Sequence, residues 1–535
     1  MTEPEKHVLP TTEGPAHDLG APTAATVEAE GEGFGLADVE QLGLLAALGS
    51  LSYVFWVCGG MEMIERLAYY GVKAVATLYA KDPVSHGGLG ITMTSFGIIL
   101  ACWAWTQTLV PAFTGGLSDR YGYKETIFVS TLVKISGYLT MAAFPSFYGF
   151  FAGAILLATG TAIFKPGIQG TLVKATNRKN SSMAWGVFYQ TVNIGGYIGP
   201  LVAGFMRKLE WRYVFLACAA IICINFLFLL VYKEPDKAER LARNQKFKEG
   251  TAKRESLWRE SLTELKKKHV WLYLAIFSGF WFMFNALFDV LPAHIDDWVD
   301  TSDVVRSLFG THGSTNPVIN FFVVMNKAGT QIQPEGMLNL DAGMIMVTCF
   351  VFAWISGKMR ATTSMVVGTL LSTAAMFMIG FSIAGWTMVI AILVFAVGEM
   401  LSSPKFSEFI GNFAPADKKA MYLGFSQIPL AVGWGLEGFV GPALYDHFGS
   451  KERFARELLL QRGMPAAQVG AIKQGEAFQK LVAFTHEAPS HLTDVLYQSH
   501  HVGALWILLG VIGVVSAIGI YMYGRWILTL STTAA

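Results

Sequence analysis

The chain has 535 residues, of which 53% are hydrophobic and only 15% are charged, and its mean hydropathy is +0.43. Soluble domains carry about 25% charged residues, so this composition indicates an integral membrane protein. The formal net charge of +1 argues against the concentrated basic footprint of a nucleic-acid-binding protein.

The N-terminal segment is acidic and lacks a hydrophobic core. Residues 1–40 hold nine carboxylates against the single lysine Lys6. A secretory signal peptide needs a basic start and a short apolar stretch, and neither is present. We therefore expect residues 1–45 to form a disordered acidic tail in the cytoplasm.

Twelve apolar segments are each long enough to cross a bilayer, which takes about 20 residues. Spanning helices satisfy their backbone hydrogen bonds internally, so these segments predict an all-α integral membrane fold. A charged linker at 233–269 divides them into six-helix bundles at 46–232 and 270–535. The expected helices lie at 50–80, 92–116, 125–145, 148–172, 184–206, 213–232, 270–293, 338–356, 363–384, 387–410, 418–444 and 501–528.

The basic residues predict the orientation of the chain in the membrane. They cluster after the even-numbered helices, and the linker 233–269 alone has twelve Lys and Arg against seven Asp and Glu. By the positive-inside rule, both termini are cytoplasmic and the protein is a multi-pass component of the cell membrane. Two insertions, at 294–337 and 445–500, should then face outward. They either cap the entrance or are simple insertions.

Charged residues inside the apolar segments predict an internal polar cavity. On the first helix, five polar side chains are spaced three or four residues apart and share one face: Glu62, Glu65, Arg66, Tyr69 and Lys73. Lys165 lies in the apolar stretch GTAIFKPGIQG on the fourth helix. A charge at the bilayer centre costs about 2.5 to 3.5 kcal/mol on insertion scales, so these groups should avoid lipid. They form either a proton-coupling site or a structural network of ion pairs.

A loop between the second and third helices resembles the signature loop of the major facilitator superfamily. The stretch GGLSDRYGYKETI (115–127) has its Gly-x-x-x-Asp-Arg-x-Gly-x-Lys spacing. The resemblance implies that Asp119 and Arg120 form a charged latch that changes between conformational states.

Four motifs at matching helices resemble the proton-dependent oligopeptide transporter family within that superfamily. The first is Glu62-x-x-Glu65-Arg66-x-x-Tyr69-Tyr70-Gly71 on the first helix. The others are GTAIFKPG with Lys165, FYQTVNIGGYIGPL (188–201) and GEMLSSPKFSEFIGNFAP (398–415). The resemblance implies a fold of two six-helix bundles that transports by alternating access, as a proton symporter.

The resemblance also implies roles for individual residues. Those for proton coupling are Glu62, Glu65, Arg66 and Lys165, and Asp289 is a replacement for a helix-seven acid. Those for substrate binding are Lys73, Tyr69, Lys165, Tyr189, Asn193, Asn285, Asp341 and Glu399. Lys165 and Lys73 would form the positive pole of the pocket and Glu399 its negative pole, as a zwitterion requires.

Several positions depart from the pattern of peptide transporters. Lys73 replaces an Arg, Asn285 replaces an acid, Asp341 replaces an Asn, and Ser426 replaces a Trp. Glu437 is new on the eleventh helix and is either a second proton site or an acid whose head group reaches the helix end. The proton machinery is thus expected to be kept and the selectivity surface to be altered.

No nucleotide-binding loop, protease motif or metal-ligand spacing of the five cysteines is present, so we expect no enzyme activity, no metal and no cofactor beyond a proton gradient. The predicted function is proton-coupled import of di- or tripeptides or a similar small zwitterion. The alternatives are transport of another organic anion or drug by antiport, and a non-transporting membrane sensor. The expected partners are the substrate, protons and membrane lipid, with no nucleic acid, and the protein is expected to be a monomer.

Overall fold

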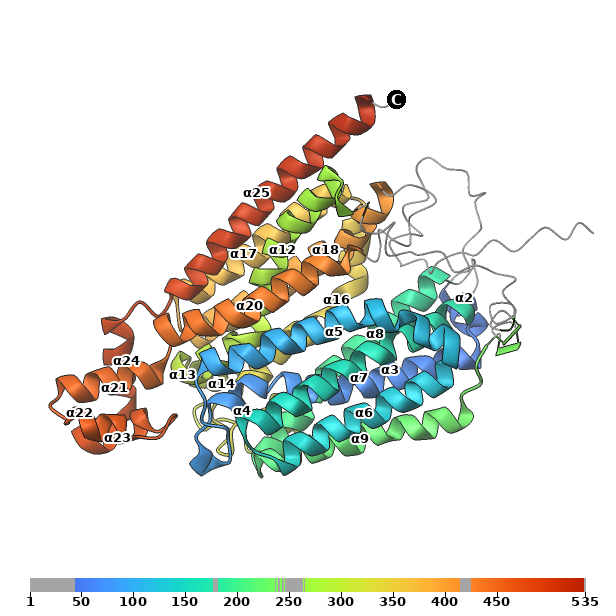
Figure 1. Cartoon of the computed structure of the whole chain (residues 1–535). Helices are drawn as coiled ribbons and strands as arrows, with labels where there is room; N and C mark the ends of the chain where they lie inside the picture. The colour runs from blue at the N-terminus through green and yellow to red at the C-terminus, as the bar shows by residue number, and fades with distance from the viewer. Residues whose placement is uncertain are drawn as a thin grey trace, which may run out of the picture.

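The computed structural model consists of two bundles of long helices, with a group of short helices at one end (Figure 1). It describes residues 44–176, 181–235, 265–413 and 425–533, with a few isolated positions between 237 and 263. Most of the expected tail (1–45) and of the expected linker (233–269) lies outside these residues.

The first bundle contains six long helices and two short ones. They are α2 (Leu44–Ser50), α3 (Tyr53–Lys73), α4 (Ala76–Lys81), α5 (Met93–Tyr121), α6 (Tyr123–Ala143), α7 (Phe147–Lys174), α8 (Ser181–Arg207) and α9 (Trp211–Val231). Side-chain caps fix two of the starts, since Ser52 accepts a hydrogen bond from the Phe55 amide and Thr92 accepts one from the Ser95 amide. The single helix expected at 50–80 is wrong, because the chain turns at Val75, between α3 and α4.

The second bundle has six long helices as well. They are α12 (Lys268–Asp289), α16 (Pro334–Gly357), α17 (Ala361–Phe381), α18 (Gly385–Phe413), α20 (Gln427–Phe448) and α25 (Ala504–Thr533). Three short helices follow α12, namely α13 (Leu291–Trp298), α14 (Ser302–Phe309) and α15 (Pro317–Phe322). The helix expected at 270–293 stops at Asp289, because Pro292 has no amide proton to continue its hydrogen bonds. The helix expected at 418–444 extends to Phe448, and residues 414–424 lie outside the described part.

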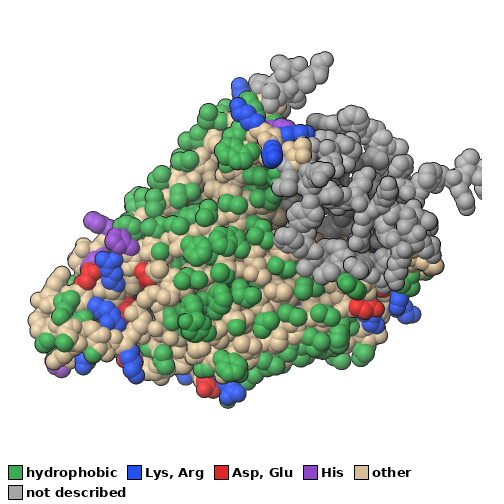
Figure 2. Space-filling model, viewed as in Figure 1, with side chains coloured by type: hydrophobic (Ala, Val, Ile, Leu, Met, Phe, Trp, Pro, Cys, Tyr) green, Lys and Arg blue, Asp and Glu red, His purple; other side chains and the backbone are tan. Residues whose placement is uncertain are grey.

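Nine of the long helices in the described part are long and apolar enough to cross a membrane. The other three, α3, α8 and α20, bear polar groups that the next subsection describes. Figure 2 shows hydrophobic side chains spread over the middle of both bundles, whereas charged side chains lie mainly toward the ends and edges of the molecule, including the short helices. This surface fits a lipid-facing belt.

The short helices after α20 pack into a small helical unit with its own apolar core. We call the unit formed by α21 (Lys451–Gln461), α22 (Ala466–Gly470), α23 (Ala477–Thr485) and α24 (Pro489–Ser499) the cap. Its core includes Phe454, Leu481, Leu492 and Leu496 and continues onto Trp298 of α13.

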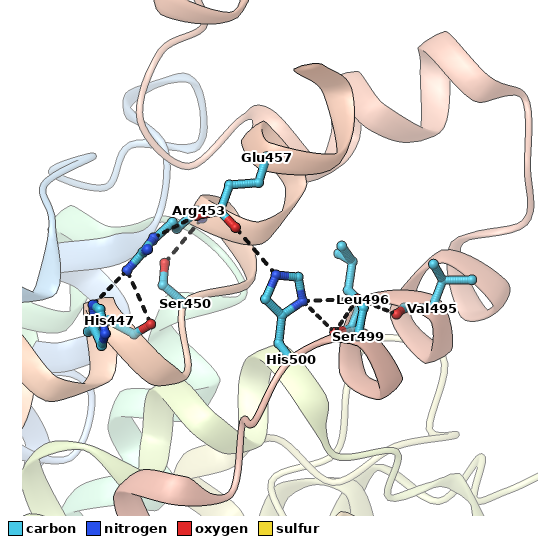
Figure 3. A network of polar contacts seen from close by, with 8 residues as sticks. All are labelled: His447, Ser450, Arg453, Glu457, Val495, Leu496, Ser499 and His500. Carbon is cyan, nitrogen blue, oxygen red and sulfur yellow. Dashed lines mark hydrogen bonds and ion pairs between the residues drawn. The ribbon is translucent and has the colours of Figure 1, made fainter. Parts of the chain in front are cut away.

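Polar contacts join the cap to α20. Arg453 lies between the backbone oxygen of His447, at 3.2 Å, and the carboxylate of Glu457, at 2.9 Å (Figure 3). His500 lies 3.3 Å from the other oxygen of Glu457, and its ring stacks on Phe454. The chain after α24 is therefore tied to α21. We call this end of the molecule the cap end and the opposite end the linker end.

The two bundles contact each other through α5 against α20 and α8 against α16. A Cβ atom on Gly97 of α5 would lie only 2.5 Å from the backbone oxygen of Gly438 on α20, so glycine permits this close approach. All ion pairs that the structure describes between the bundles lie at the cap end. One of them joins Arg207 at the end of α8 to Glu335 at the start of α16, at 3.2 Å. The bundles are therefore fastened together at the cap end.

Candidate functional site

A buried group of charges occupies one face of α3. Arg66 Nε lies 2.8 Å from Oε1 of Glu62 and 3.0 Å from Oε2 of Glu65. Glu62 and Arg66 are each 5% exposed, and Glu65 is 0% exposed. The predicted shared face is therefore present, and one guanidinium serves both carboxylates.

Two residues that the sequence analysis missed complete this group. Lys134 of α6 places Nζ 3.4 Å from Oε1 of Glu65, and Thr161 of α7 donates a hydrogen bond of 3.1 Å to the same oxygen. Lys134 is fully buried, and its Nζ lies 3.7 Å from the ring centre of Phe164. Gly160 leaves room for it, because a Cβ atom there would collide with the lysine side chain. Lys165 was identified because it is a charged residue within an apolar helix. The same criterion would have identified Lys134.

Lys165 lies beside this group without joining it. Its side chain is half-buried on α7 and interacts electrostatically with Glu62, Glu65 and Arg66. Among the residues that the structure describes, it has no carboxylate oxygen within 4.0 Å. In this conformation Lys134, and not Lys165, is the lysine paired with Glu65. We call Glu62, Glu65, Arg66, Lys134 and Lys165 the α3 charge cluster.

Two acids lie on the other bundle. Glu399 of α18 and Asp341 of α16 interact electrostatically with each other. Neither has an ion pair with any described cation, and one oxygen of each is buried without a hydrogen-bond donor in the described part of the chain. Tyr70 is within electrostatic range of both Arg66 and Glu399, and Tyr189 is within range of Tyr70, Glu399 and Asp341. Tyr70 therefore lies near both the α3 charge cluster and Glu399.

The remaining predicted substrate residues on α3 and α8 differ in accessibility. Tyr189 is 43% exposed, so this part of α8 borders accessible space. The Asn193 amide donates to the backbone oxygen of Tyr189 at 3.1 Å, within its own helix. Tyr69 is only 3% exposed and packs edge-on against Trp103. The structure thus puts Tyr189 at the accessible surface of the site and Tyr69 in the packing behind it.

A second buried group connects the end of α3 with the other bundle. Lys73 forms an ion pair with Oδ1 of Asp289, and Trp434 of α20 donates a 2.8 Å hydrogen bond to Oδ2. Thr77 donates to the backbone oxygen of Asp289 at 2.8 Å. Lys73 also lies over the rings of Trp103 and Trp434, at 5.4 and 5.0 Å. Glu437 of α20 interacts electrostatically with Asp289 and Lys73. We call Lys73, Asp289, Trp434 and Glu437 the Lys73 cluster.

Asn285 does not take part in this ion pair, although the sequence places it one turn before Asp289. Its amide donates to the backbone oxygen of Trp281 at 2.7 Å. Asp289 is the last residue of α12, which brings it level with Lys73 at the end of α3. The structure therefore pairs Lys73 with the acid that the sequence offered as a replacement.

An outer layer of ion pairs lies beyond the Lys73 cluster at the cap end. Lys81 contacts Asp296 at 2.8 Å and Asp297 at 2.5 Å, and Lys451 of the cap donates to the backbone oxygen of Asp297 at 2.9 Å. Burial opposes the charged form of Lys81, but Asp296 and Asp297 outweigh it and raise the Lys81 pKa above its usual value. These residues border a cavity of about 240 Å³ between the two bundles and the cap.

The predicted latch cannot be placed. Asp119 and Arg120 belong to the last turn of α5, but their side chains lie outside the described part of the structure. The described residues contain no group of three or more His, Cys, Asp or Glu side chains arranged to hold a metal ion.

The charges of the two bundles are unequal and opposite. The α3 charge cluster has three cations and two carboxylates, so it holds one positive charge in excess when all are ionised. The pair on the other bundle, Glu399 and Asp341, has no ion pair with a cation in the described part of the chain. An excess cation in one bundle and unpaired acids in the other suit a ligand with a negative and a positive end.

Two curated relatives are named for peptide transport and for multidrug resistance. The peptide transporter YePEPT of Yersinia enterocolitica is 28% identical over 162 residues, which cover 29% of this chain and 31% of the relative. This match thus spans about a third of the length of that relative. The multidrug resistance protein MdtH of Klebsiella pneumoniae is 22% identical over 412 residues, covering 77% of this chain and 89% of the relative.

The fold is shared with solved transporters. A crystal structure of a peptide transporter POT in complex with sulfate aligns with a TM-score of 0.60 and 15% identity, covering 90% of this chain and 99% of the other. The sequence profile described as Major Facilitator Superfamily matches residues 63–436, from the first spanning helix to the eleventh. The chain therefore belongs to the major facilitator superfamily.

Proposed function

We propose that this protein is a proton-coupled symporter that imports di- or tripeptides, or a similar small zwitterion, across the cell membrane. The observation that supports this proposal best is a half-buried cation, Lys165, in one bundle and two acids, Glu399 and Asp341, in the other, none of which has an ion pair in the described part of the chain. Tyr70 interacts electrostatically with a member of each group, Arg66 and Glu399. Lys165 would bind the substrate carboxylate, and Glu399 with Asp341 would bind its amino group. The POT name of the structural neighbour and the name of YePEPT favour peptides.

The basic linker favours an orientation with the linker end in the cytoplasm and the cap end outside, by the positive-inside rule. The ion pairs between the bundles then close the site toward the outside, with Lys73 and Asp289 innermost and Lys81 with Asp296 and Asp297 at the rim. Alternating access requires these pairs to break when the site opens outward. Import would follow when substrate and proton favour their re-formation.

Coupling follows from the balance of charges in the α3 charge cluster. A proton on Glu65 would release part of the attraction that holds Arg66 and Lys134, and would raise the positive excess beside Lys165. A substrate carboxylate would then bind more tightly, and by linkage a bound carboxylate would raise the affinity for the proton. Proton and substrate would therefore move in the same direction.

Transport in proteoliposomes tests the proposal. With pyranine trapped inside and an inside-negative potential, di-alanine added outside should acidify the lumen. The Glu65→Gln variant should lose acidification while still exchanging labelled peptide across the membrane, because the binding site remains but the proton acceptor is gone. Glu125→Gln, an exposed acid on α6, is the matched control and should behave as the unaltered protein. Silence across di- and tripeptides would rule out peptides as the substrate.

A second proposal, drug–proton antiport, is favoured by the long match to MdtH, a protein named for multidrug resistance. The same liposomes separate the two proposals. An antiporter loaded with protons should become alkaline inside when a cationic drug is added outside. A symporter should become more acidic with its substrate.

A further inference from the structure

Glu437 is a fully buried acid with no donor to stabilise a negative charge. It lies in the middle of α20 and is 0% exposed. Neither of its carboxyl oxygens has a hydrogen-bond donor among the described residues. One oxygen contacts the position where a Cβ atom of Gly441 would lie, one turn along the same helix. Its head group therefore does not reach the helix end, and the alternative of an acid extended into solvent is wrong.

The neighbour of Glu437 is the carboxyl group of Asp289. The two acids interact electrostatically and lie within hydrogen-bond reach of each other when one of them holds a proton. Asp289 is already engaged, since Lys73 pairs with Oδ1 and Trp434 donates to Oδ2. Trp434 precedes Glu437 by three residues, so both side chains face α12 from the same side of α20.

The charges around this point do not balance if both acids are ionised. Lys73 is the cation that the structure describes here, and it is paired with Asp289. The other helices that pack on this part of α20 add no charge: α5 presents Leu100 and Ala101, and the single charged residue of α25, Arg525, lies near the linker end. Two carboxylates would thus share one ammonium in a water-free site.

A proton resolves this imbalance. An ionised carboxylate without a cation or donor is costly to bury, so such a group takes up a proton instead. A protonated Glu437 donates its O–H to a carboxylate oxygen of Asp289 and leaves Lys73 with one full negative charge. This arrangement satisfies the Glu437 hydroxyl and adds a third polar partner to Asp289.

We propose that Glu437 is a second proton-binding residue, which holds its proton while Lys73 and Asp289 close the cap end and releases it when they part. On separation of the bundles, Lys73 leaves Asp289 and water enters, so Glu437 ionises. Glu437 would then be protonated when the cap end is closed and ionised when it is open. Its protonation rests on the geometry alone, whereas its part in coupling rests on the proposed function.

Infrared spectroscopy of the full protein in membranes tests the protonation without any substrate. The C=O stretch of a protonated carboxyl group is separate from the bands of a carboxylate. At neutral pH, the difference spectrum between the unaltered protein and Glu437→Gln should show the loss of one such band. Identical spectra in this region would mean that Glu437 is ionised and would overturn the proposal.

Two further variants make the test specific. Glu335→Gln removes another fully buried acid, but one with a cation, Arg207, at 3.2 Å, and it should remove no protonated-carboxyl band. Asp289→Asn should abolish the Glu437 band although Glu437 is intact. Glu437 is then the only acid beside Lys73, so it should ionise to balance the charge of the lysine. Persistence of that band in Asp289→Asn would overturn the arrangement in which the two acids share a proton.

A flux ratio then tests the role in coupling. Protons and a labelled substrate counted together should give a lower proton-to-substrate ratio in Glu437→Gln than in the unaltered protein. An unchanged ratio together with a lost infrared band would overturn the role in coupling. Absence of any peptide flux would instead refute the proposed substrate, and the infrared result would still decide the protonation of Glu437.

Discussion

The two buried charge groups on α3 differ in where their partners come from. Glu65 has partners on α6 and α7, and Arg66 has its partners on α3, all in the same bundle. Lys73, near the end of the same helix, has its partners on α12 and α20 of the other bundle. When two bundles rock against each other as rigid bodies, contacts within a bundle persist and contacts between bundles break. The α3 charge cluster can therefore keep its charge balance through the cycle, whereas the Lys73 cluster cannot.

The two groups also differ in the sign of their excess charge. The α3 charge cluster has a cation to spare, Lys165, and the Lys73 cluster has an acid to spare, Glu437. A spare cation attracts an anionic ligand, and a spare acid attracts a proton. The comparison teaches that, under the proposed function, substrate binding and closure would involve different ends of one helix.

The largest expected effect comes from removing the shared cation of the α3 charge cluster. Arg66→Met leaves Glu62 without its partner and Glu65 with only Lys134, and breaking a buried pair in this way costs about 3–5 kcal/mol. Unfolding of the purified protein in detergent should show this loss at neutral pH.

The control for this experiment is an exposed arginine in the cap. Arg453→Met breaks a pair with Glu457 whose members are 45% and 39% exposed. Such pairs contribute at most about 1 kcal/mol. Equal losses for Arg66→Met and Arg453→Met would contradict the claim that the α3 charge cluster is a structural unit of its bundle.

The second prediction concerns the Lys73 cluster and its dependence on bundle position. Lys73→Met should shift the protein toward an open cap end, since it leaves Asp289 buried and without its cation. Double electron–electron resonance between nitroxides on Val84 and Leu308, both exposed at the cap end, measures this opening in a background without native cysteines. The double variant Lys73→Met/Asp289→Asn should be less open than Lys73→Met, because no unpaired charge remains. A distance unchanged in Lys73→Met would show that this ion pair does not hold the cap end closed.

The third prediction separates the two lysines beside Glu65. Lys165→Met should leave thermal stability unchanged within error, because Lys165 has no described ion pair, yet should weaken binding of an anionic substrate by about 2 kcal/mol, roughly 30-fold. Lys134→Met should lower stability, because it removes a buried partner of Glu65. Thermal melts with and without di-alanine measure both effects. The contrast fails if the two variants lose stability to the same extent.

The sequence was enough to predict the helices and the polar face of α3. Each spanning helix is a local pattern of apolar residues, and the spacing of Glu62, Glu65 and Arg66 is fixed by the helical repeat alone. Lys134 was within reach of the same argument, since it interrupts the apolar segment 125–145 as Lys165 interrupts its own.

The contacts between residues of different bundles could not be predicted from the sequence. Asn285 and Asp289 lie on one face of α12, and only the level at which α12 and α3 end decides that Asp289 meets Lys73. The burial of Glu437 likewise depends on how α20 packs against α5 and α12. These distances join residues more than a hundred positions apart, and no local pattern sets them.

The smallest expected effect on closure comes from the ion pairs of Lys81 at the rim of the cap end. This prediction compares an exposed ion pair with the buried pair of Lys73 and Asp289. Asp296 is 43% exposed, and its pair with Lys81 should contribute at most about 1 kcal/mol to closure. Lys81→Gln should therefore open the Val84–Leu308 distance less than Lys73→Met does. Its effect should shrink in high salt, which screens exposed pairs more than buried ones.

The pH dependence of the rim has a definite sign. Burial opposes the ionised form of Asp296, but Lys81 outweighs it and holds the Asp296 pKa below its ordinary value of about 3.9. The contribution of this pair to closure is therefore complete above that ordinary value and is lost as the pH falls through the lowered pKa. Between pH 5 and 8 the rim should not respond to pH, so any opening of the Val84–Leu308 distance in that range must come from deeper groups. If Lys81→Gln removed such a response, the rim and not the Lys73 cluster would be the pH-sensitive part of the closure.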